Sequence, residues 1–193
     1  IPSSVDRVVH AASINEGHCP HCLHKTSKNG VITYFHNVLE AKLITPNGFA
    51  ISLASEWIEN STAYEKQDCE LKAFARLAEK LQALFPRLRL CLHADGLYPN
   101  ATFFNICKIY DWRYLVTLKD LSLKSLWEEI EMELLTSKNQ RGCSQPQRQS
   151  RQTYRWLDGL SYQGHALSWI ECLDEHDGEA HRFVYVTDLE ADF

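Results

Sequence analysis

The stretch "RLRLCLHADGLYPN", residues 87–100, decides how the chain around it folds. Its apolar centre, "LRLCL", predicts a buried strand, which ends on a single carboxylate, Asp95, followed by Gly96. Because burial disfavours a charged carboxylate, we expect Asp95 to be half-exposed, hydrogen-bonded or bound to a cation. The simpler alternative is that Asp95 only forms the turn that begins at Gly96.

Strands and helices alternate on both sides of this stretch. Residues 5–11 and 31–44 are rich in β-branched and apolar side chains, and an Asn-Gly pair at residues 47–48 predicts a hairpin into a strand at 49–59. Apolar residues three and four apart predict the first of three helices, which lie at residues 64–85, 100–110 and 123–135. Another strand is predicted at residues 112–120. Strands joined through helices should lie parallel.

The C-terminal third reads as a polar segment followed by strands. Residues 136–152 are rich in Gln, Ser and Arg without an apolar pattern, which predicts a mobile linker or loop. Two short strands joined by a turn are expected within residues 153–174, and another at 181–189. The arginines in or beside the polar segment either are solvated or contact phosphate: Arg141, Arg148, Arg151 and Arg155.

Composition narrows the partners and the compartment. The formal net charge is −5, so binding to a polyanion would need local basic patches or metal ions held by acids. Seven scattered cysteines, an odd number, predict reduced thiols and a reducing cytosol. There is no apolar run of roughly 20 residues and no targeting pattern, so we expect no membrane association.

Two aspartates stand out as a candidate metal site. Asp6 is the only Asp before Asp68, and it lies in the first predicted strand. In the expected strand order that strand lies next to the one ending at Asp95, so the two carboxylates would converge. Such a pair offers the oxygen ligands that Mg²⁺ prefers, and metal ions held there can promote phosphoryl transfer.

Several segments, in one order along the chain, carry a resemblance to a known family. They are "HCPHCL", "WIEN", "EKQDCELKAFARLAEKL", "FPRLRLCLHADGLYPN", "WRYLVTLKD", "LWEEIE" and "RFVYVTDLEAD". From about Asp6 to its last residue, the sequence resembles bacterial insertion-sequence transposases of the DDE type. The resemblance implies an α/β fold, an RNase H-like mixed sheet flanked by helices, with a small β-rich insertion. It places the core in residues 1–136, the linker and β-rich insertion in 137–182, and a return strand in 183–193.

The resemblance also implies a reaction, metal-dependent phosphodiester cleavage and strand transfer on DNA. Asp95 matches the family's second catalytic acid and Asp6 the first, although Arg7 stands where the family often has Gly. Both would hold Mg²⁺ or Mn²⁺. The third acid, a Glu, is expected on a helix downstream of "VTDLEAD", so we expect it to be absent here and this piece to be inactive.

Further implied properties concern the intact parent protein. Its partners would be transposon ends and target DNA, and a homodimer is the assembly that the family suggests. It would work in the bacterial cytoplasm, associated with the nucleoid when acting. The alternative is a catalytically inactive remnant, an RNase H-like domain that at most binds DNA or protein.

A Cys-x-x-Cys pair forms a second candidate site. Cys19 and Cys22 have zinc-knuckle spacing, and His24 with one distant ligand such as His36 would complete a Zn²⁺ site. The favoured interpretation is a loop with reduced thiols. The same spacing is also compatible with a redox pair or with a zinc-stabilised interaction module.

Three more side chains are candidates for weaker roles. Lys119 follows the last core strand and would meet a phosphate if it lies at the active edge; an ordinary surface lysine is the alternative. Glu56 ends the second hairpin strand and is either solvated or aimed at that edge. Trp156 stacks on an unpaired base or packs within the insertion.

Overall fold

The computed structural model describes residues 2–14, 19–60, 68–120, 122–145, 150–176 and 178–191. The chain divides into two compact units, Ile1–Leu90 and Cys91–Phe193. Helices and strands occur in both, which confirms the prediction of a mixed α/β fold. The predicted division into residues 1–136, 137–182 and 183–193 follows the family pattern and stays a prediction. No helix in the described ranges is both long and apolar enough to cross a membrane.

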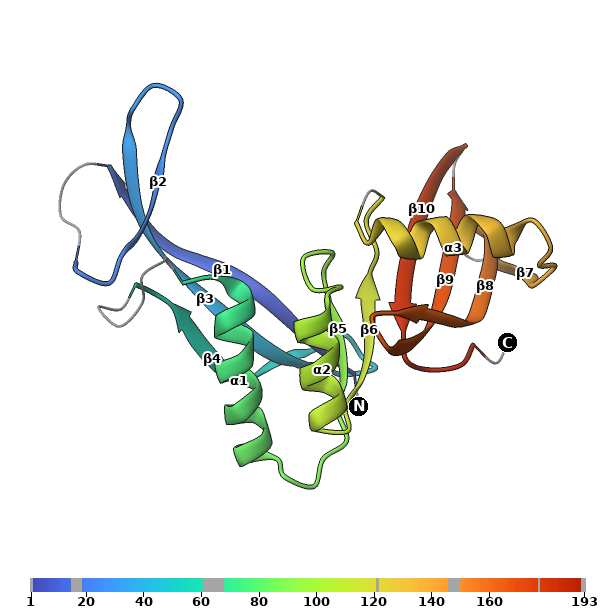
Figure 1. Cartoon of the computed structure of the whole chain (residues 1–193). Helices are drawn as coiled ribbons and strands as arrows, with labels where there is room; N and C mark the ends of the chain where they lie inside the picture. Colours follow the sequence, from blue (N-terminus) through green and yellow to red (C-terminus); the bar gives the residue numbers. More distant parts are fainter. Residues whose placement is uncertain are drawn as a thin grey trace. The chain divides into compact units, whose positions relative to one another are not determined.

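The first unit is an antiparallel sheet built on one long strand. Its strands are β1 (Pro2–Ile14), β2 (Leu23–Thr26), β3 (Ile32–Ile44) and β4 (Ala50–Ile58). β3 pairs with β1 along one edge, while β2 and β4 pair with successive halves of its other edge (Figure 1). The β3–β4 turn contains Asn47 and Gly48, and Gly48 has a φ of 86°, so the predicted Asn-Gly hairpin is confirmed.

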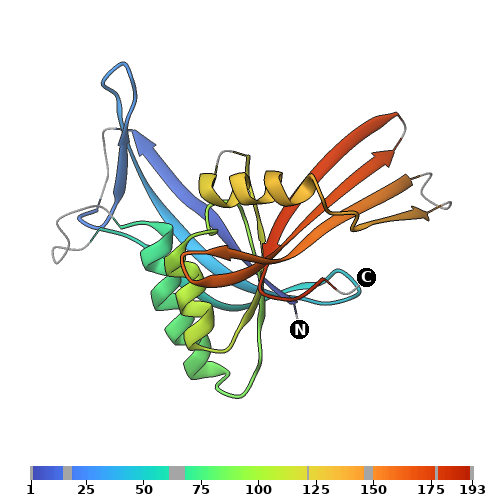
Figure 2. The ribbon, with the colours of Figure 1, turned by 45° about the vertical axis from the view of Figure 1, so that its right-hand side comes forward.

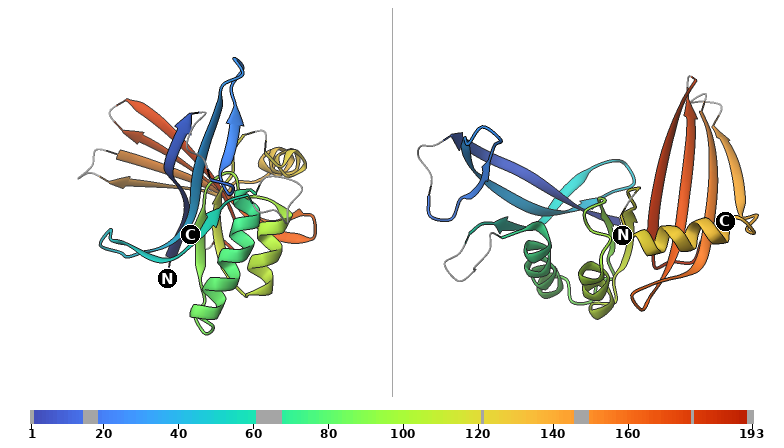
Figure 3. Two further views of the ribbon diagram at one scale, coloured as in Figure 1. Left: turned by 90° about the vertical axis from the view of Figure 1, so that its left-hand side faces the viewer. Right: turned by 45° about the horizontal axis from the view of Figure 1, so that its top comes forward.

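Helix α1 (Glu70–Leu84) lies beside β3 and β4 in the same unit (Figure 3). Its predicted apolar stripe is buried, with Phe74, Leu77 and Leu81 at 1% exposure or less. The helix prediction is therefore confirmed from Glu70 onward; residues 61–67 lie outside the described part of the chain.

An ion-pair cluster joins α1 to β4. Arg76 Nε lies 2.6 Å from Glu56 Oε1, and Arg76 Nη2 lies 2.6 Å from Asp68 Oδ2. Arg76 Nη2 also donates to the Trp57 carbonyl oxygen, and Lys80 pairs with Glu56. Glu56 is thus neither solvated nor free, because two cations of α1 bind it.

The second unit has a sheet in the order β5-β6-β10-β9-β8-β7. Its elements are β5 (Cys91–Ala94), α2 (Ala101–Ile109), β6 (Arg113–Thr117), α3 (Lys124–Leu134), β7 (Gln140–Gln145), β8 (Ser150–Tyr162), β9 (His165–His176) and β10 (Glu179–Thr187). β5 and β6 are parallel with α2 between them, as predicted, and the other pairs are antiparallel. Figure 1 shows α3 lying across one face of the strands β8 to β10, and Figure 2 shows the same helix and strands turned by 45°.

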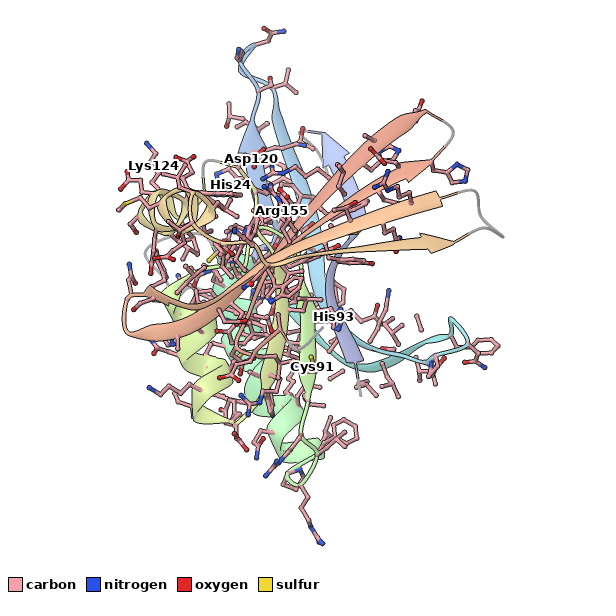
Figure 4. The ribbon with its side chains drawn as sticks, turned by 90° about the vertical axis from the view of Figure 1, so that its right-hand side faces the viewer. His24, Cys91, His93, Asp120, Lys124 and Arg155 are labelled. Carbon is pink, nitrogen blue, oxygen red and sulfur yellow. The ribbon has the colours of Figure 1, made fainter. Side chains whose placement is uncertain are left out.

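The core of this unit forms around β5, β6 and α2. Leu92 of β5 is fully buried. Its neighbours along the strand, Cys91 and His93, are labelled in Figure 4. The ring of Phe104 stacks on that of Tyr114 with centroids 5.1 Å apart. The strand predicted from "LRLCL" is confirmed in its second half, beginning at Cys91.

The prediction of a linker or loop at residues 136–152 is wrong where the structure has strands, at Gln140–Gln145 and from Ser150 onward. β7 covers Gln140–Gln145 and β8 begins at Ser150, with residues 146–149 outside the described part. Among the described strands β7 pairs with β8, whose backbone hydrogen bonds hold it, and its sequence, "QRGCSQ", contains no large apolar side chain. A strand of this kind leaves no apolar pattern in the sequence. The short strand β2 escaped prediction for the same reason, since only Leu23 of its four residues is buried.

Candidate functional site

Asp95 lies directly after β5 and is exposed. Its Oδ1 accepts a hydrogen bond of 2.8 Å from the backbone N–H of Leu97, and its carbonyl oxygen accepts one of 3.1 Å from the N–H of Tyr98. Asp95 therefore does form the predicted turn. Within the described residues Oδ2 has no hydrogen-bond partner, so one carboxylate oxygen remains available to a cation.

Lys119 lies at the same edge of the sheet as Asp95. The parallel register pairs Ala94 with Val116, so the residues that follow both strands leave the sheet together. The Lys119 side chain lies against Gly96: a Cβ built there would be 2.5 Å from Lys119 Cε. This edge of the second unit thus presents a carboxylate and an ammonium group on adjoining segments.

Hydrogen bonds to neighbouring residues fix the backbone at Lys119. Its carbonyl oxygen accepts from Trp127 Nε1 at 3.1 Å and from Ser122 Oγ at 2.6 Å. The preceding residue, Leu118, donates its N–H to the Val184 carbonyl oxygen at 2.8 Å. The exposed Lys119 side chain is therefore carried by an anchored segment.

Asp6 belongs to the first unit, where its backbone pairs with Glu40 in the β1–β3 register. Its side chain lies outside the described part of the chain. Asp95 belongs to the second unit, so the predicted convergence of the two carboxylates stays a prediction.

Arg155 is part of a charged cluster on the sheet face that α3 crosses. Arg155 Nε donates to Glu171 Oε2 at 2.6 Å, and Arg182 Nε donates to Glu171 Oε1 at 2.7 Å. Arg182 Nη1 also donates to Asp120 Oδ1 at 2.9 Å; Figure 4 labels Arg155 and Asp120. Glu171 is 5% exposed. The Arg155 guanidinium is therefore already paired with a buried carboxylate, which weakens its case as a phosphate ligand.

The structure describes some of the other residues that were predicted to contact DNA. Arg151 is exposed on β8, and its Cα pairs with that of Glu175. Trp156 on β8 is half-buried. Arg148 lies outside the described residues, as does the side chain of Arg141, so DNA binding by these arginines stays a prediction.

Asp188 is a feature at the other end of β6 that sequence reasoning missed. Its Oδ1 accepts from the Tyr114 N–H at 3.1 Å, and its Oδ2 lies 3.0 Å from Arg113 Nη1. It lines a cavity of about 360 Å³ together with His165, whose pKa is lowered by burial and by Lys108. These residues come from separate segments, so no sequence motif connects them.

A cluster of possible metal ligands lies in the first unit. Cys22 Sγ is 3.2 Å from His36 Nε2, Cys19 Sγ is 3.5 Å from the same nitrogen, and the two sulfur atoms are 3.5 Å apart. All three candidate ligand atoms lie within 4.8 Å of one another. The histidine of the cluster is His36 on β3. His24 lies on β2, where its ring centroid is 6.1 Å from that of Tyr34.

Backbone and side-chain bonds hold the Cys-x-x-Cys loop in place. The Cys22 N–H donates to the Cys19 carbonyl oxygen at 3.2 Å, closing a turn. Asn60, which follows β4, donates its N–H to the His21 carbonyl oxygen at 2.9 Å and its Nδ2 to the Cys22 carbonyl oxygen at 2.8 Å. Burial raises the pKa of the Cys22 thiol; the hydrogen bond from the Cys19 backbone N–H opposes this rise, and the adjacent Cys19 thiol adds to it.

Comparison with known proteins finds little. No protein-family model matches the chain, and no curated protein matches it. One solved structure similar to it is the cryo-EM structure of the piggyBac transposase synaptic complex with hairpin DNA. The two are 11% identical with a TM-score of 0.43, and the match covers 99% of this chain and 34% of the other. The chain thus spans about a third of the length of that transposase.

Proposed function

We propose that the chain is part of the catalytic core of a DDE-type DNA transposase with an RNase H-like fold. The observation that carries this proposal is the meeting of Asp95 and Lys119 at one edge of the parallel β5–β6 pair. Reactive groups of α/β sheets gather at the carboxyl ends of parallel strands. The ordered sequence segments that resemble bacterial insertion-sequence transposases support the same interpretation.

In this proposal Asp95 would hold a divalent metal ion, Mg²⁺ or Mn²⁺, and the resemblance assigns Asp6 as a further ligand. The donor set fits, because both cations prefer carboxylate oxygens and Asp95 Oδ2 is unengaged within the described residues. A bound ion would stabilise charge on the phosphodiester and its leaving oxygen. The ammonium group of Lys119 would contact a non-bridging phosphate oxygen and orient the DNA backbone.

A second candidate is favoured by the hydrogen bond from Leu97 to Asp95. It shows that Asp95 has a turn-forming role that needs no metal. In that case the chain is a catalytically inactive remnant that at most binds DNA or protein.

A metal titration separates the two candidates. We would add Mn²⁺ to the ¹⁵N-labelled chain and follow paramagnetic broadening of the Gly96 and Leu97 amides. The proposal requires broadening centred on these amides that D95N abolishes. The D6N variant tests the second ligand, which should weaken the same broadening.

The matched control is D111N. Asp111 is exposed at the opposite end of β6 and has a φ of 53°, a conformation that Asn also adopts. D111N removes one carboxylate charge and should leave the broadening unchanged. No response up to millimolar Mn²⁺, or an equal loss in D95N and D111N, would reject the metal-dependent function and favour the remnant.

A further inference from the structure

We propose that Cys19, Cys22 and His36 bind one zinc ion in the first unit, at a site separate from the proposed catalytic edge. The proposal rests on the convergence of two thiols and an imidazole nitrogen from two segments, the loop before β2 and the middle of β3. It does not depend on the transposase proposal, because neither Asp95 nor Lys119 takes part.

The distances within the cluster fit tetrahedral zinc. Bonds of about 2.3 Å to sulfur and about 2.0–2.1 Å to nitrogen, at tetrahedral angles, put two sulfur ligands about 3.8 Å apart and a sulfur and a nitrogen about 3.6 Å apart. The Cys19–Cys22 sulfur distance is 3.5 Å, and the two sulfur–nitrogen distances are 3.2 and 3.5 Å. Shifts of a few tenths of an ångström would therefore complete the ligand geometry.

The surroundings hold the ligands in this arrangement. Cys19 donates its backbone N–H to Cys22 Sγ at 3.4 Å, a bond that would stabilise negative charge on that sulfur. The His36 ring packs edge-on against Trp57, with centroids 6.0 Å apart. The two bonds from Asn60 to the loop fix its other side. The loop and the imidazole are thus positioned independently of a metal.

Other uses of the two thiols fit the geometry less well. Both cysteines are free thiols in the structure and do not form a disulfide there. A redox Cys-x-x-Cys pair opens a helix, whereas this one precedes the strand β2. The imidazole nitrogen facing both sulfur atoms matches the sulfur and nitrogen ligands that zinc selects.

Three protein ligands leave the fourth tetrahedral position to water or another donor. Cys19 is exposed, so solvent reaches the cluster. The ion would join the loop before β2 to β3, the strand with which β1, β2 and β4 all pair. Binding would convert the two thiols to thiolates and release their protons to solvent.

Cobalt substitution of the reduced, full chain tests the proposal. Co²⁺ should bind with one ion per chain and show sulfur-to-cobalt charge-transfer absorption together with the visible bands of tetrahedral coordination. Zn²⁺ should displace it at one equivalent. Since this measurement uses the unaltered chain, misfolding of a variant cannot obscure it.

Matched variants then identify the ligands. C22S and H36A should lose stoichiometric binding, while C69S, which removes an exposed thiol at the start of α1, and H24A should retain it. Circular dichroism of each variant reports whether it folds. The proposal is wrong if the reduced chain binds no Co²⁺, if H36A binds as well as the unaltered chain, or if thiol titration after chelation finds Cys19 and Cys22 joined in a disulfide.

Discussion

The side chain of Lys119 lies so close to the α-carbon of Gly96 that a methyl group there would come within 2.5 Å of Lys119 Cε. A glycine at this position lets the lysine stay at the edge that carries Asp95. Because the Lys119 side chain is flexible, a Cβ at residue 96 would displace it. The main effect of the added Cβ would therefore be a change in the position of Lys119.

The G96A variant should therefore affect DNA binding more than stability. If Lys119 contacts a phosphate, K119A should make the negative slope of log affinity against log salt concentration less steep by about 0.9 for duplex DNA. G96A should also make this slope less steep. Its free energy of unfolding should change by no more than about 1 kcal/mol. Fluorescence anisotropy at several salt concentrations measures the slope.

The double variant G96A/K119A provides the control for that prediction. It should bind DNA no more weakly than K119A, because both changes act on one side chain. Fully additive losses would show that Gly96 acts by another route.

Replacing Glu171 should destabilise the second unit. Its buried carboxylate accepts from both Arg155 and Arg182, so E171Q leaves two guanidinium groups with a weaker partner. Because both arginines are partly exposed, we expect a loss of about 1–3 kcal/mol in the free energy of unfolding. Urea denaturation measures it. E175Q, on the same face of β9 but exposed, should change stability by no more than about 0.5 kcal/mol.

Acid should weaken the ion-pair cluster between α1 and β4. Burial opposes ionisation of Glu56, but hydrogen bonds from Lys80 and Arg76 outweigh it and lower the pKa of Glu56. Because the pKa of Glu56 is lowered in the folded state, the stabilisation from its ionised carboxylate is complete above the unfolded-state pKa of about 4.3. That stabilisation is lost as pH falls through the lower folded-state pKa.

The E56Q variant isolates this contribution. The unaltered chain should exceed it in unfolding free energy by about 1 kcal/mol at pH 7, and the difference should shrink below about pH 4.3. Urea denaturation across pH tests this. E79Q, which alters an exposed residue of α1, should show no such dependence. A constant difference down to low pH would contradict the assignment.

Removal of zinc should loosen the first unit selectively. If an ion joins the loop at Cys19 to His36, chelation should increase hydrogen exchange of backbone amides in residues 19–36. Amides of β9, in the second unit, should exchange as before and serve as the internal control. Exchange followed by mass spectrometry resolves the two regions. Equal changes in both would indicate general destabilisation.

Elements with a buried face were predictable from sequence. The apolar spacing in α1 predicted residues that are buried, among them Phe74 and Leu77, and the helix between β5 and β6 implied their parallel pairing. β7 was not predictable, because its sequence, "QRGCSQ", has no large apolar residue and therefore no alternation for a pattern to detect. A periodicity signal exists only where one side of an element is removed from water.

Side-chain partners that depend on strand register were harder to predict than elements. The sequence placed His24 beside Cys19 and Cys22 and gave His36 as an example of a distant ligand, and of these two it is His36, on the next strand, that faces both sulfur atoms. Likewise nothing in the sequence links Arg155 to Glu171, which pair because their strands align them across the sheet. Such contacts follow from which residues lie opposite each other, and local patterns do not encode that.

The composition of β7 has a consequence for how the chain behaves in solution. As the last strand of its sheet, β7 has one side on which no described strand pairs with it. An open strand edge can recruit another chain and start aggregation. β7 reads "QRGCSQ", without a β-branched or large apolar side chain, and so offers an incoming strand little to pack against. The polar composition that made β7 hard to predict from the sequence would also help to prevent separate copies of the protein from pairing through this strand edge.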